Sequence, residues 1–307
     1  MKYRAKHLIE YALLRILAGT LRILPYKIAL FLAWLNALQA FYLFHSRVRE
    51  AESRIKEVFG NRFNDRQARD ISWISWRNMA FIFIEMTRTP KLTMKWFRKY
   101  ANFDSVIEKL KTHTDAGQAG ILAVAHMGNW EIGTAALCIH GIPLFSIAAK
   151  QRNPLANEYI NRLRSHHGMQ ILTRGQGTMK QVMRNLASGM LLGILPDVRV
   201  STGGIKIQFL DKEANIGSGM ARFARHANVP IFPCVVTRRG WARLESKLYD
   251  PVYPDGNTPK AQDEERMTKE VLKCFENAIR AEPEQWFWFN KRWILEPIEP
   301  GNASIHS

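Results

Sequence analysis

Residues 119–133 read AGILAVAHMGNWEIG, which is the pattern of a buried strand followed by a turn and a helix. A short apolar run ends at His126, Gly128 and Asn129 form a turn, and Glu131 falls in the first turn of a predicted helix, with Asn129 as its N-cap. Parallel α/β sheets place their binding sites at the ends of strands that pass into helices in this way. The stretch therefore predicts both a fold class and a candidate site.

The rest of the C-terminal half repeats this alternation. Short apolar runs recur at 142–149, 190–197, 205–209 and 229–238. Helical patterns separate the runs, at 130–140, 153–167, 176–188 and 218–227. Strands alternating with helices of this length predict an α/β fold with a mostly parallel central sheet flanked by helices.

The N-terminal half is helical in pattern. Residues 45–60 are amphipathic and stop at Gly60-Asn61, and an apolar helix over 71–86 ends before Pro90. We divide the chain into hydrophobic, membrane-associating helices at 1–44 and a catalytic domain at 45–307. The catalytic domain comprises a helical lead-in at 45–115 and an α/β body at 116–307.

The first 44 residues are strongly apolar, and residues 28–44 carry no charge. Basic and acidic residues interrupt the apolar run before that segment and no small-residue cleavage site follows, which argues against a secretory signal. Seventeen helical residues rise about 26 Å, marginal for a bilayer core of about 30 Å. Two helices that meet near Pro25 and lie in one leaflet fit better, and a pair of buried core helices is the alternative.

The net charge of +17 implies an anionic partner: nucleic acid, a membrane surface, or an acidic protein or substrate. A solvated basic surface without a partner is the alternative reading. The three cysteines are far apart, so the sequence predicts no disulfide framework, no zinc site and a reducing compartment. We expect no metal.

Two His-x4-Glu pairs occur, and their contexts differ. His45 and Glu50 lie in one continuous helical pattern, where residues five apart point about 140° away from each other. A turn separates His126 from Glu131, so that carboxylate is expected to reach the imidazole, and a histidine held by a carboxylate is a general base. No G-x-S-x-G elbow and no glycine-rich phosphate loop is present, so we expect the base to activate a substrate hydroxyl.

Four blocks, in order, resemble the bacterial lipid A biosynthesis acyltransferases, the late acyltransferases of the lauroyl and myristoyl type within the glycerolipid acyltransferase superfamily. The blocks are AHMGNWE, KQRNPLANEYINRLRSHHG, the long stretch from LLGILPDVRV to VPIFPCV, and PEQWFWFNKRW. The resemblance covers nearly the whole chain. It implies a cofactor-free transfer of an acyl chain from acyl carrier protein to a hydroxyl of a phosphorylated lipid A precursor, at the cytoplasmic face of the bacterial inner membrane.

The resemblance also suggests roles for residues outside the first block. His126 and Glu131 would be catalytic. Arg164 and Arg199 would stabilise an oxyanion or bind acceptor phosphates, or form surface salt bridges. Arg199 departs from the family, which usually has Asp-Gln-Asp where this chain has Asp197-Val198-Arg199.

Other positions could bind substrate or serve the fold. Asp197 would line the site or cap a strand end, and Asn153 would cap a helix rather than touch substrate. Arg292 and Lys291 could meet lipid phosphates. Three tryptophans of the last block are expected in the core or at an interface: Trp286, Trp288 and Trp293.

Two other functions stay open. Within enzymes, the acceptor could be another glycolipid, such as an inositol mannoside, or a lysophospholipid. Outside enzymes, the chain could be a basic membrane-bound or nucleic-acid-binding protein without catalysis. The basic residues are spread along the chain rather than clustered, and that reading leaves the turn between His126 and Glu131 unexplained, so we expect no nucleic-acid partner.

Overall fold

The computed structural model describes residues 3–201 and 203–296. The stretch that opens the site folds as predicted, with strand β2 (Gly120–Val124) buried along its length and helix α7 (Trp130–Ile139) capped by Asn129. Between them Gly128 has φ +55°, and a Cβ on it would lie 2.3 Å from the carbonyl oxygen of Val236. Only glycine fits this turn.

Strand β2 lies inside the central sheet. The strands of that sheet are β1 (Ala101–Asn102), β2, β3 (Leu144–Ala148), β4 (Gln170–Thr173), β5 (Leu191–Ile194), β8 (Ile231–Arg239) and β9 (Arg243–Leu248). Their order is β1-β9-β8-β2-β5-β3-β4. Within the described residues every pairing is parallel except the antiparallel β8–β9 pair, which confirms the mostly parallel sheet.

One predicted strand lies elsewhere. Residues 205–209 belong to β6 (Gly204–Phe209), which pairs antiparallel with β7 (Lys212–Gly217) in a separate two-stranded sheet. Its expected place in the central sheet is wrong, because a tight turn at Leu210 and Asp211 joins the two strands. A parallel partner would require a long crossover between the strands.

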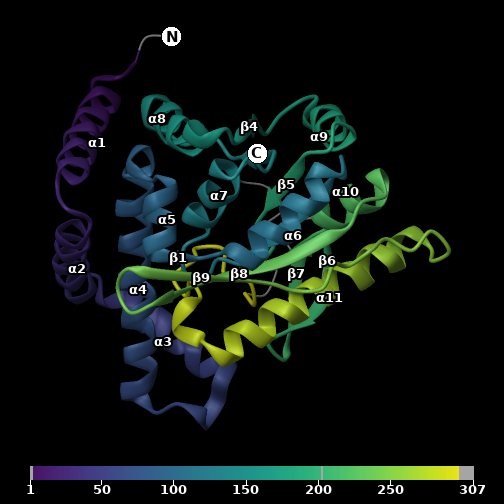
Figure 1. Ribbon diagram of the computed structural model, residues 1–307. Helices are drawn as coiled ribbons and strands as arrows, with labels where there is room; N and C mark the ends of the chain where they lie inside the picture. The colour runs from purple at the N-terminus through teal and green to yellow at the C-terminus, as the bar shows by residue number, and fades with distance from the viewer. Residues whose placement is uncertain (1–2, 202, 297–307) are drawn as a thin grey trace.

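Helices cover both faces of the sheet (Figure 1). One apolar core joins α6 (Asp104–Asp115) and α7 to the sheet, and a second joins α9 (Thr178–Ala187), α10 (Gly219–Ala227) and α11 (Lys260–Ala281) to its other face. The predicted helices at 130–140, 176–188 and 218–227 match α7, α9 and α10 closely. The remaining short helices are α5 (Met94–Tyr100), α8 (Pro154–Arg164) and the 3-10 turns Gly60–Arg62, Thr89–Lys91, Ser165–His167 and Pro283–Gln285.

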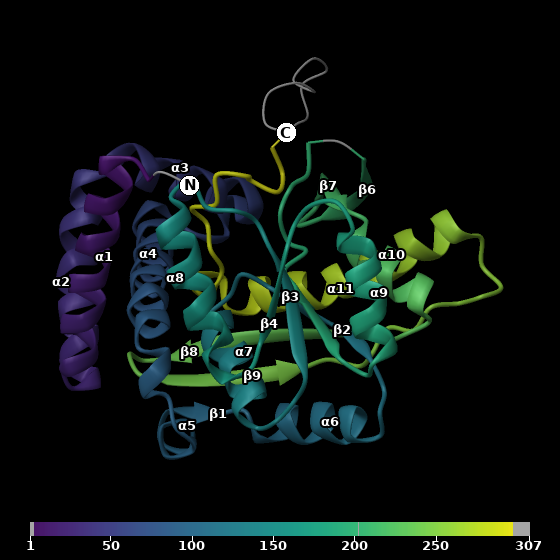
Figure 2. The same ribbon diagram turned by 90° about the horizontal axis from the view of Figure 1, so that it is seen from above.

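The N-terminal half is helical, as predicted. Helices α1 (Ala5–Ile23) and α2 (Tyr26–Leu43) meet at Pro25, followed by α3 (His45–Phe59) and α4 (Asp65–Thr87). His45 and Glu50 both lie in α3, so that pair is part of a continuous helix. Figure 2 shows α1 and α2 outermost, next to α4 and α8, and α1 contacts both of those helices. Leu30 of α2 packs against Phe81 of α4.

The outer surface of α1 and α2 is unusually apolar. Of the 19 large hydrophobic side chains that are exposed among the described residues, 14 belong to residues 3–44. Ile16 is 68% exposed, Leu13 63% and Ile9 61%. By length and composition, α2 is the one described helix that could cross a membrane. The domain boundaries at 1–44 and 45–307 include residues 1–2 and 297–307, which lie outside the described residues.

Candidate active site

The sheet brings His126 and Asp197 together. In the parallel pair β2 and β5, Ala123 lies opposite Ile194, and His126 and Asp197 each follow three residues later. The Nδ1 atom of His126 lies 2.7 Å from Oδ1 of Asp197, and the backbone N–H of His126 donates to Oδ2 at 2.8 Å. Two residues 71 positions apart in sequence are thus joined side chain to side chain.

Asp197 is an ionised acceptor. It is 3% exposed, and the indole N–H of Trp286 also donates to its Oδ2, at 2.9 Å. Burial alone would raise the pKa of Asp197, but the charge on His126 and the hydrogen bonds from His126 and Trp286 hold that pKa below its ordinary value. Because the carboxylate can only accept, Nδ1 of His126 carries a proton, so in the neutral form of the imidazole the lone pair is on Nε2.

The C-terminal aromatic block is part of this site. Trp286 forms an antiparallel bridge with Met127, and the carbonyl of Gln285 accepts from the N–H of Gly128 at 2.9 Å. The N–H of Phe287 donates to the carbonyl of His126 at 3.0 Å. The block therefore fixes the backbone at 126–129, which we call the catalytic turn because it carries the candidate base. The burial of Trp286 places it in the core as predicted.

The predicted contact between Glu131 and His126 is wrong. Glu131 instead binds Arg164 at the end of α8, with Nε of Arg164 at 3.1 and 3.0 Å from its two carboxylate oxygens and Nη2 also donating. The first turn of α7 directs Glu131 toward α8. The ring of Trp130 packs edge-on against the imidazole of His126, with 4.9 Å between the ring centroids. Asp197 takes the place beside the imidazole that the sequence had suggested for Glu131.

The ion pair of Arg164 with Glu131 is largely shielded from water. The side chains are 28% and 10% exposed. Burial lowers the pKa of Arg164, but the charge and hydrogen bonds of Glu131 outweigh it and leave the pKa above its ordinary value. The site therefore holds a fixed ion pair, with no net charge, on the α8 side of the catalytic turn.

Asn153 serves the fold. Its Oδ1 caps α8 by accepting from the N–H of Leu155 at 3.0 Å, as expected for an Asn-Pro start. Its Nδ2 donates to Glu10 of α1 at 2.9 Å, so it also ties the N-terminal helix to α8.

The two remaining arginines differ in position. Arg292 lines a small, nearly filled pocket together with His126, Asp197, Trp286 and Trp293. Arg199 pairs with Glu296 at 3.0 Å, which is the salt-bridge alternative. Lys291 is exposed next to Arg292.

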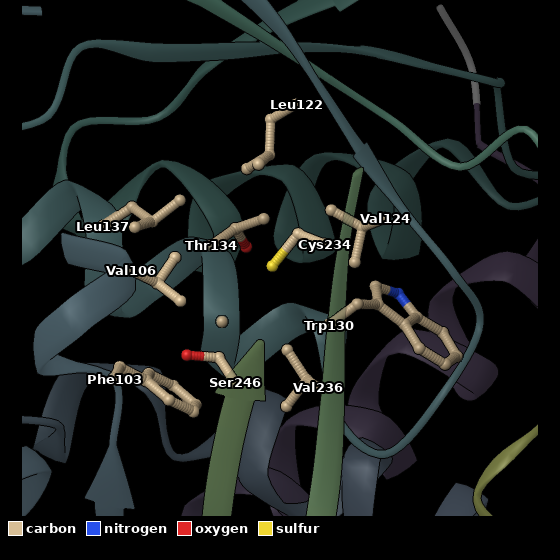
Figure 3. A pocket seen from close by; sticks show the side chains of 11 residues that line it. Phe103, Val106, Leu122, Val124, Trp130, Thr134, Leu137, Cys234, Val236 and Ser246 are labelled. Carbon is tan, nitrogen blue, oxygen red and sulfur yellow. The ribbon is translucent and has the colours of Figure 1, made fainter. Parts of the chain in front are cut away.

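A second, apolar pocket lies under α7 (Figure 3). It is a narrow cavity of about 20 Å³, and its lining comes from α6, α7, β2, β8, β9 and the residue preceding α6. Trp130 stands on one side of it, with Phe103 and Val106 opposite. Because Trp130 also packs against His126, this pocket and the imidazole share a wall.

The sequence reasoning missed the partner of the histidine. The available signal was that two apolar runs, AVAH and GILPD, each end in a titratable residue. Parallel strands bring such ends to one edge of a sheet. This signal was incomplete. The run at 142–149 lies closer in sequence to 119–126, and the run at 229–238 is equally apolar, so no local feature tells which strand will pair with 119–126 in the sheet.

Residues 2–294 match the family of bacterial lipid A biosynthesis acyltransferases. The chain belongs to this family. The lipid A biosynthesis acyltransferase family is the one that the four sequence blocks resemble, and the prediction of an acyltransferase is confirmed at this level.

Three similar proteins are named phosphatidylinositol mannoside acyltransferases. The one from Mycolicibacterium smegmatis is 22% identical over 65% of this chain and 64% of its own length. Those from two Mycobacterium tuberculosis strains, CDC 1551 and H37Rv, are 24% and 22% identical over 73% of this chain and 70% of their own. This lipid A biosynthesis acyltransferase family member thus spans about two thirds of the mycobacterial proteins it resembles.

Proposed function

We propose that the protein moves a fatty acyl chain from an acyl carrier protein thioester to a hydroxyl of a phosphorylated glycolipid, with a lipid A precursor as the first candidate. The hydrogen bond between Nδ1 of His126 and Asp197 carries this proposal, because it leaves Nε2 as the base. Nε2 takes the hydroxyl proton as the oxygen attacks the thioester carbon. The tetrahedral intermediate then expels the thiolate, which takes the proton back from His126, so an ester and a thiol are formed.

The oxyanion of that intermediate needs a positive or donating neighbour. Arg164 is our candidate. Glu131 engages its Nε and Nη2, which holds the guanidinium in one orientation and leaves the Nη1 donors directed elsewhere. Glu131 is then an anchor for this arginine and does not orient the base.

The apolar pocket under α7 is our candidate for the acyl chain. Its cavity volume is only about 20 Å³ in this structure, so side chains of the lining would have to move apart to admit an acyl chain. Apart from Thr134 and Ser246 the lining is apolar or glycine, which suits such a chain. It shares Trp130 with His126, so a chain inserted there would hold its thioester near the base. Lauroyl or myristoyl specificity would follow from the depth of this pocket.

The acceptor is expected in the pocket that contains Arg292 beside His126. A guanidinium fork suits a phosphate oxygen, and lipid A precursors are phosphorylated. The mycobacterial relatives favour a second candidate, a phosphoinositol mannoside or related glycolipid, which also carries a phosphate. Arg199, which replaces a family acid and pairs with Glu296, leaves both acceptors in contention.

The charge of +17 supports two anionic partners, acyl carrier protein and the inner leaflet of the bacterial membrane. Polybasic attraction contributes about 1 kcal/mol per residue near such a surface. We propose that the exposed apolar side chains of α1 and α2 enter that leaflet and that the enzyme works at the cytoplasmic face of the inner membrane.

The test is acyl transfer by the purified protein in vesicles, with acyl carrier protein or coenzyme A as carrier of the same chain. Three acceptors are compared by mass spectrometry: a lipid A precursor, a phosphatidylinositol mannoside and a lysophospholipid. We expect an added ester only with a glycolipid, and faster with acyl carrier protein. Transfer only to the lysophospholipid would contradict the proposal.

Membrane association is tested by surface changes on α1. Replacing Ile9, Leu13 and Ile16 together with glutamine should lower partitioning onto anionic vesicles at least about 100-fold, since each loses part of the roughly 1.5–3 kcal/mol that burial of such a side chain contributes. Folding should be unaffected, because all three are more than half exposed. Met179→Gln on α9 is the matched control, and equal vesicle binding by the triple variant would contradict the anchor.

The pair Glu131 and Arg164 should act as one unit. Glu131→Gln and Arg164→Gln are each expected to lower kcat, and the double variant should be no worse than Arg164→Gln alone, because Glu131 works through the arginine. The check is a double-mutant cycle on kcat. Multiplicative losses would show that Glu131 acts independently of Arg164.

The acyl pocket predicts a change in chain preference. Val106→Phe adds a ring to the pocket lining, so kcat/KM for a long-chain donor should fall at least about tenfold relative to a short-chain donor. The ratio within one variant cancels any change in folded fraction. An unchanged ratio would exclude this pocket as the acyl site.

A further inference from the structure

A buried carboxylate lies behind the catalytic turn, outside the residues that the proposed reaction uses. Glu85 of α4 is 1% exposed. Arg238 of β8 binds it through two nitrogens, with Nη1 at 3.0 Å from Oε1 and Nη2 on Oε2. Arg238 is itself 2% exposed, so the two charges neutralise each other in the interior.

Two further donors reach Glu85 from other elements. The hydroxyl of Tyr26, at the start of α2, donates to Oε1, and Nδ2 of Asn129 donates to Oε2. Burial and the neighbouring carboxylate raise the pKa of Tyr26 well above its ordinary value, so the phenol stays a donor. The carboxylate therefore joins the N-terminal helices, β8 and the catalytic turn.

Asn129 is the link to the chemistry. While its Nδ2 is held by Glu85, its Oδ1 accepts from the N–H of Ile132 at 3.0 Å and caps α7. The side-chain amide of Asn129 thus connects the start of α7, which carries Trp130 and Glu131, to the carboxylate of Glu85 in α4. Asn129 is fully buried, so no water replaces either bond.

A carboxylate is required at this position. Its four partner groups from Arg238, Tyr26 and Asn129 are all donors, and a carboxylate offers about four acceptor sites. A glutamine would turn an NH2 group toward one of these donors. Arg238 alone is sufficient to balance the charge of Glu85. The additional hydrogen bond from Asn129 connects this carboxylate to the catalytic turn.

We propose that Glu85 is a positioning residue for acyl transfer, which holds Asn129 and through it sets Trp130 and Glu131 relative to His126. It touches neither substrate nor reacting atoms. This inference rests on the proposed function of the same site. Misplacement of reacting groups by about 1 Å can cost about 100-fold in rate, so a loosened turn should lower kcat while leaving the fold intact.

The main test is Asn129→Ser. Serine caps a helix about as well as asparagine but cannot donate to Glu85 in the same way. We expect kcat, per folded protein, to fall by about 10- to 100-fold with little change in the KM of either substrate. Asn185→Ser is the matched control, because Asn185 is also a buried amide that donates to a side chain, Gln170, away from the site. The control should keep wild-type kcat.

A rescue separates positioning from general stability. Glu85→Gln and Asn129→Asp should each lower kcat, the first by removing an acceptor and the second by opposing two carboxylates. Together they reverse the direction of the hydrogen bond, since Nε2 of the introduced glutamine can donate to the introduced aspartate, whose other oxygen still caps α7. Recovery is partial, because that NH2 group also faces Nη2 of Arg238. We expect the double variant to recover at least about tenfold in kcat over Glu85→Gln, measured at a temperature where circular dichroism shows all variants folded.

The outcomes distinguish this inference from the proposed function. A folded Asn129→Ser protein with wild-type kcat overturns the positioning role, as does a double variant no better than Glu85→Gln. A wild-type protein that transfers no acyl chain to any acceptor overturns the proposed function and this inference with it. If Asn129→Ser does not fold, the rescue by the double variant decides the question alone.

Discussion

Replacing His126 with alanine is expected to lower kcat for acyl transfer by about 10⁴-fold, the upper end of what a general base contributes. The reason is geometric: among the described residues, His126 is the imidazole hydrogen-bonded to a buried carboxylate at the end of the sheet. Its side chain is 20% exposed, so the substitution leaves no large cavity and the fold should persist. The measurement is steady-state transfer from acyl carrier protein, with melting curves recorded in parallel.

His45→Ala is the matched control for this experiment. His45 also precedes a glutamate by five positions, but it is exposed at the start of α3, far along the chain from the catalytic turn. It should keep nearly full activity. Equal losses of kcat in both variants, or no loss in His126→Ala, would contradict the assignment of His126 as the base.

Replacing Asp197 with asparagine is expected to lower kcat by about 10³- to 10⁴-fold, the scale that the corresponding change produces in a serine protease triad. Oδ2 of Asp197 accepts from two N–H groups, of His126 and Trp286, so the amide oxygen of asparagine must take that place. Its NH2 group then faces Nδ1 of His126 and donates to it. The ring proton is forced onto Nε2, which can no longer accept from the acceptor hydroxyl.

Substrate affinity should be nearly unchanged in Asp197→Asn, because the carboxylate lies behind the ring and its side chain is fully shielded. A raised KM with normal kcat would mean that Asp197 binds substrate, which is the other role the sequence suggested. Trp286→Phe offers a graded comparison. It removes one of the three hydrogen bonds on Asp197 and should cost less than the loss of the charge.

What the sequence could predict was local. Gly128 predicts a turn because glycine tolerates positive φ, and Asn129 predicts a helix N-cap because its side chain can accept from a backbone N–H. The structure has both. The predicted contact of Glu131 with His126 was wrong, because the partner of Glu131 depends on the direction in which α7 leaves the sheet. That direction brings Glu131 to Arg164 at the end of α8. That direction is set by packing between helices, which the six residues from His126 to Glu131 do not determine.

Asp197 was visible as a residue but not as a partner. Its role follows from the position of β5 beside β2, and strand order results from how all the crossover helices pack together. The N-terminal segment shows the same limit. Composition alone allowed α1 and α2 to be core or surface, and the exposed fractions of side chains such as Leu13 and Ile16 decide between them.

The register of β2 and β5 makes the site intolerant of changes in chain length. His126 and Asp197 meet only because each lies three residues beyond a matched pair, Ala123 and Ile194. One residue inserted or deleted between 120 and 126, or between 191 and 197, moves one partner along its strand by about 3.3 Å and turns its side chain to the opposite face. The β6–β7 hairpin lies outside that sheet, so a change of length at its tip leaves this register untouched. Wherever loop length is varied in this protein, the two strand ends should therefore be kept at constant length.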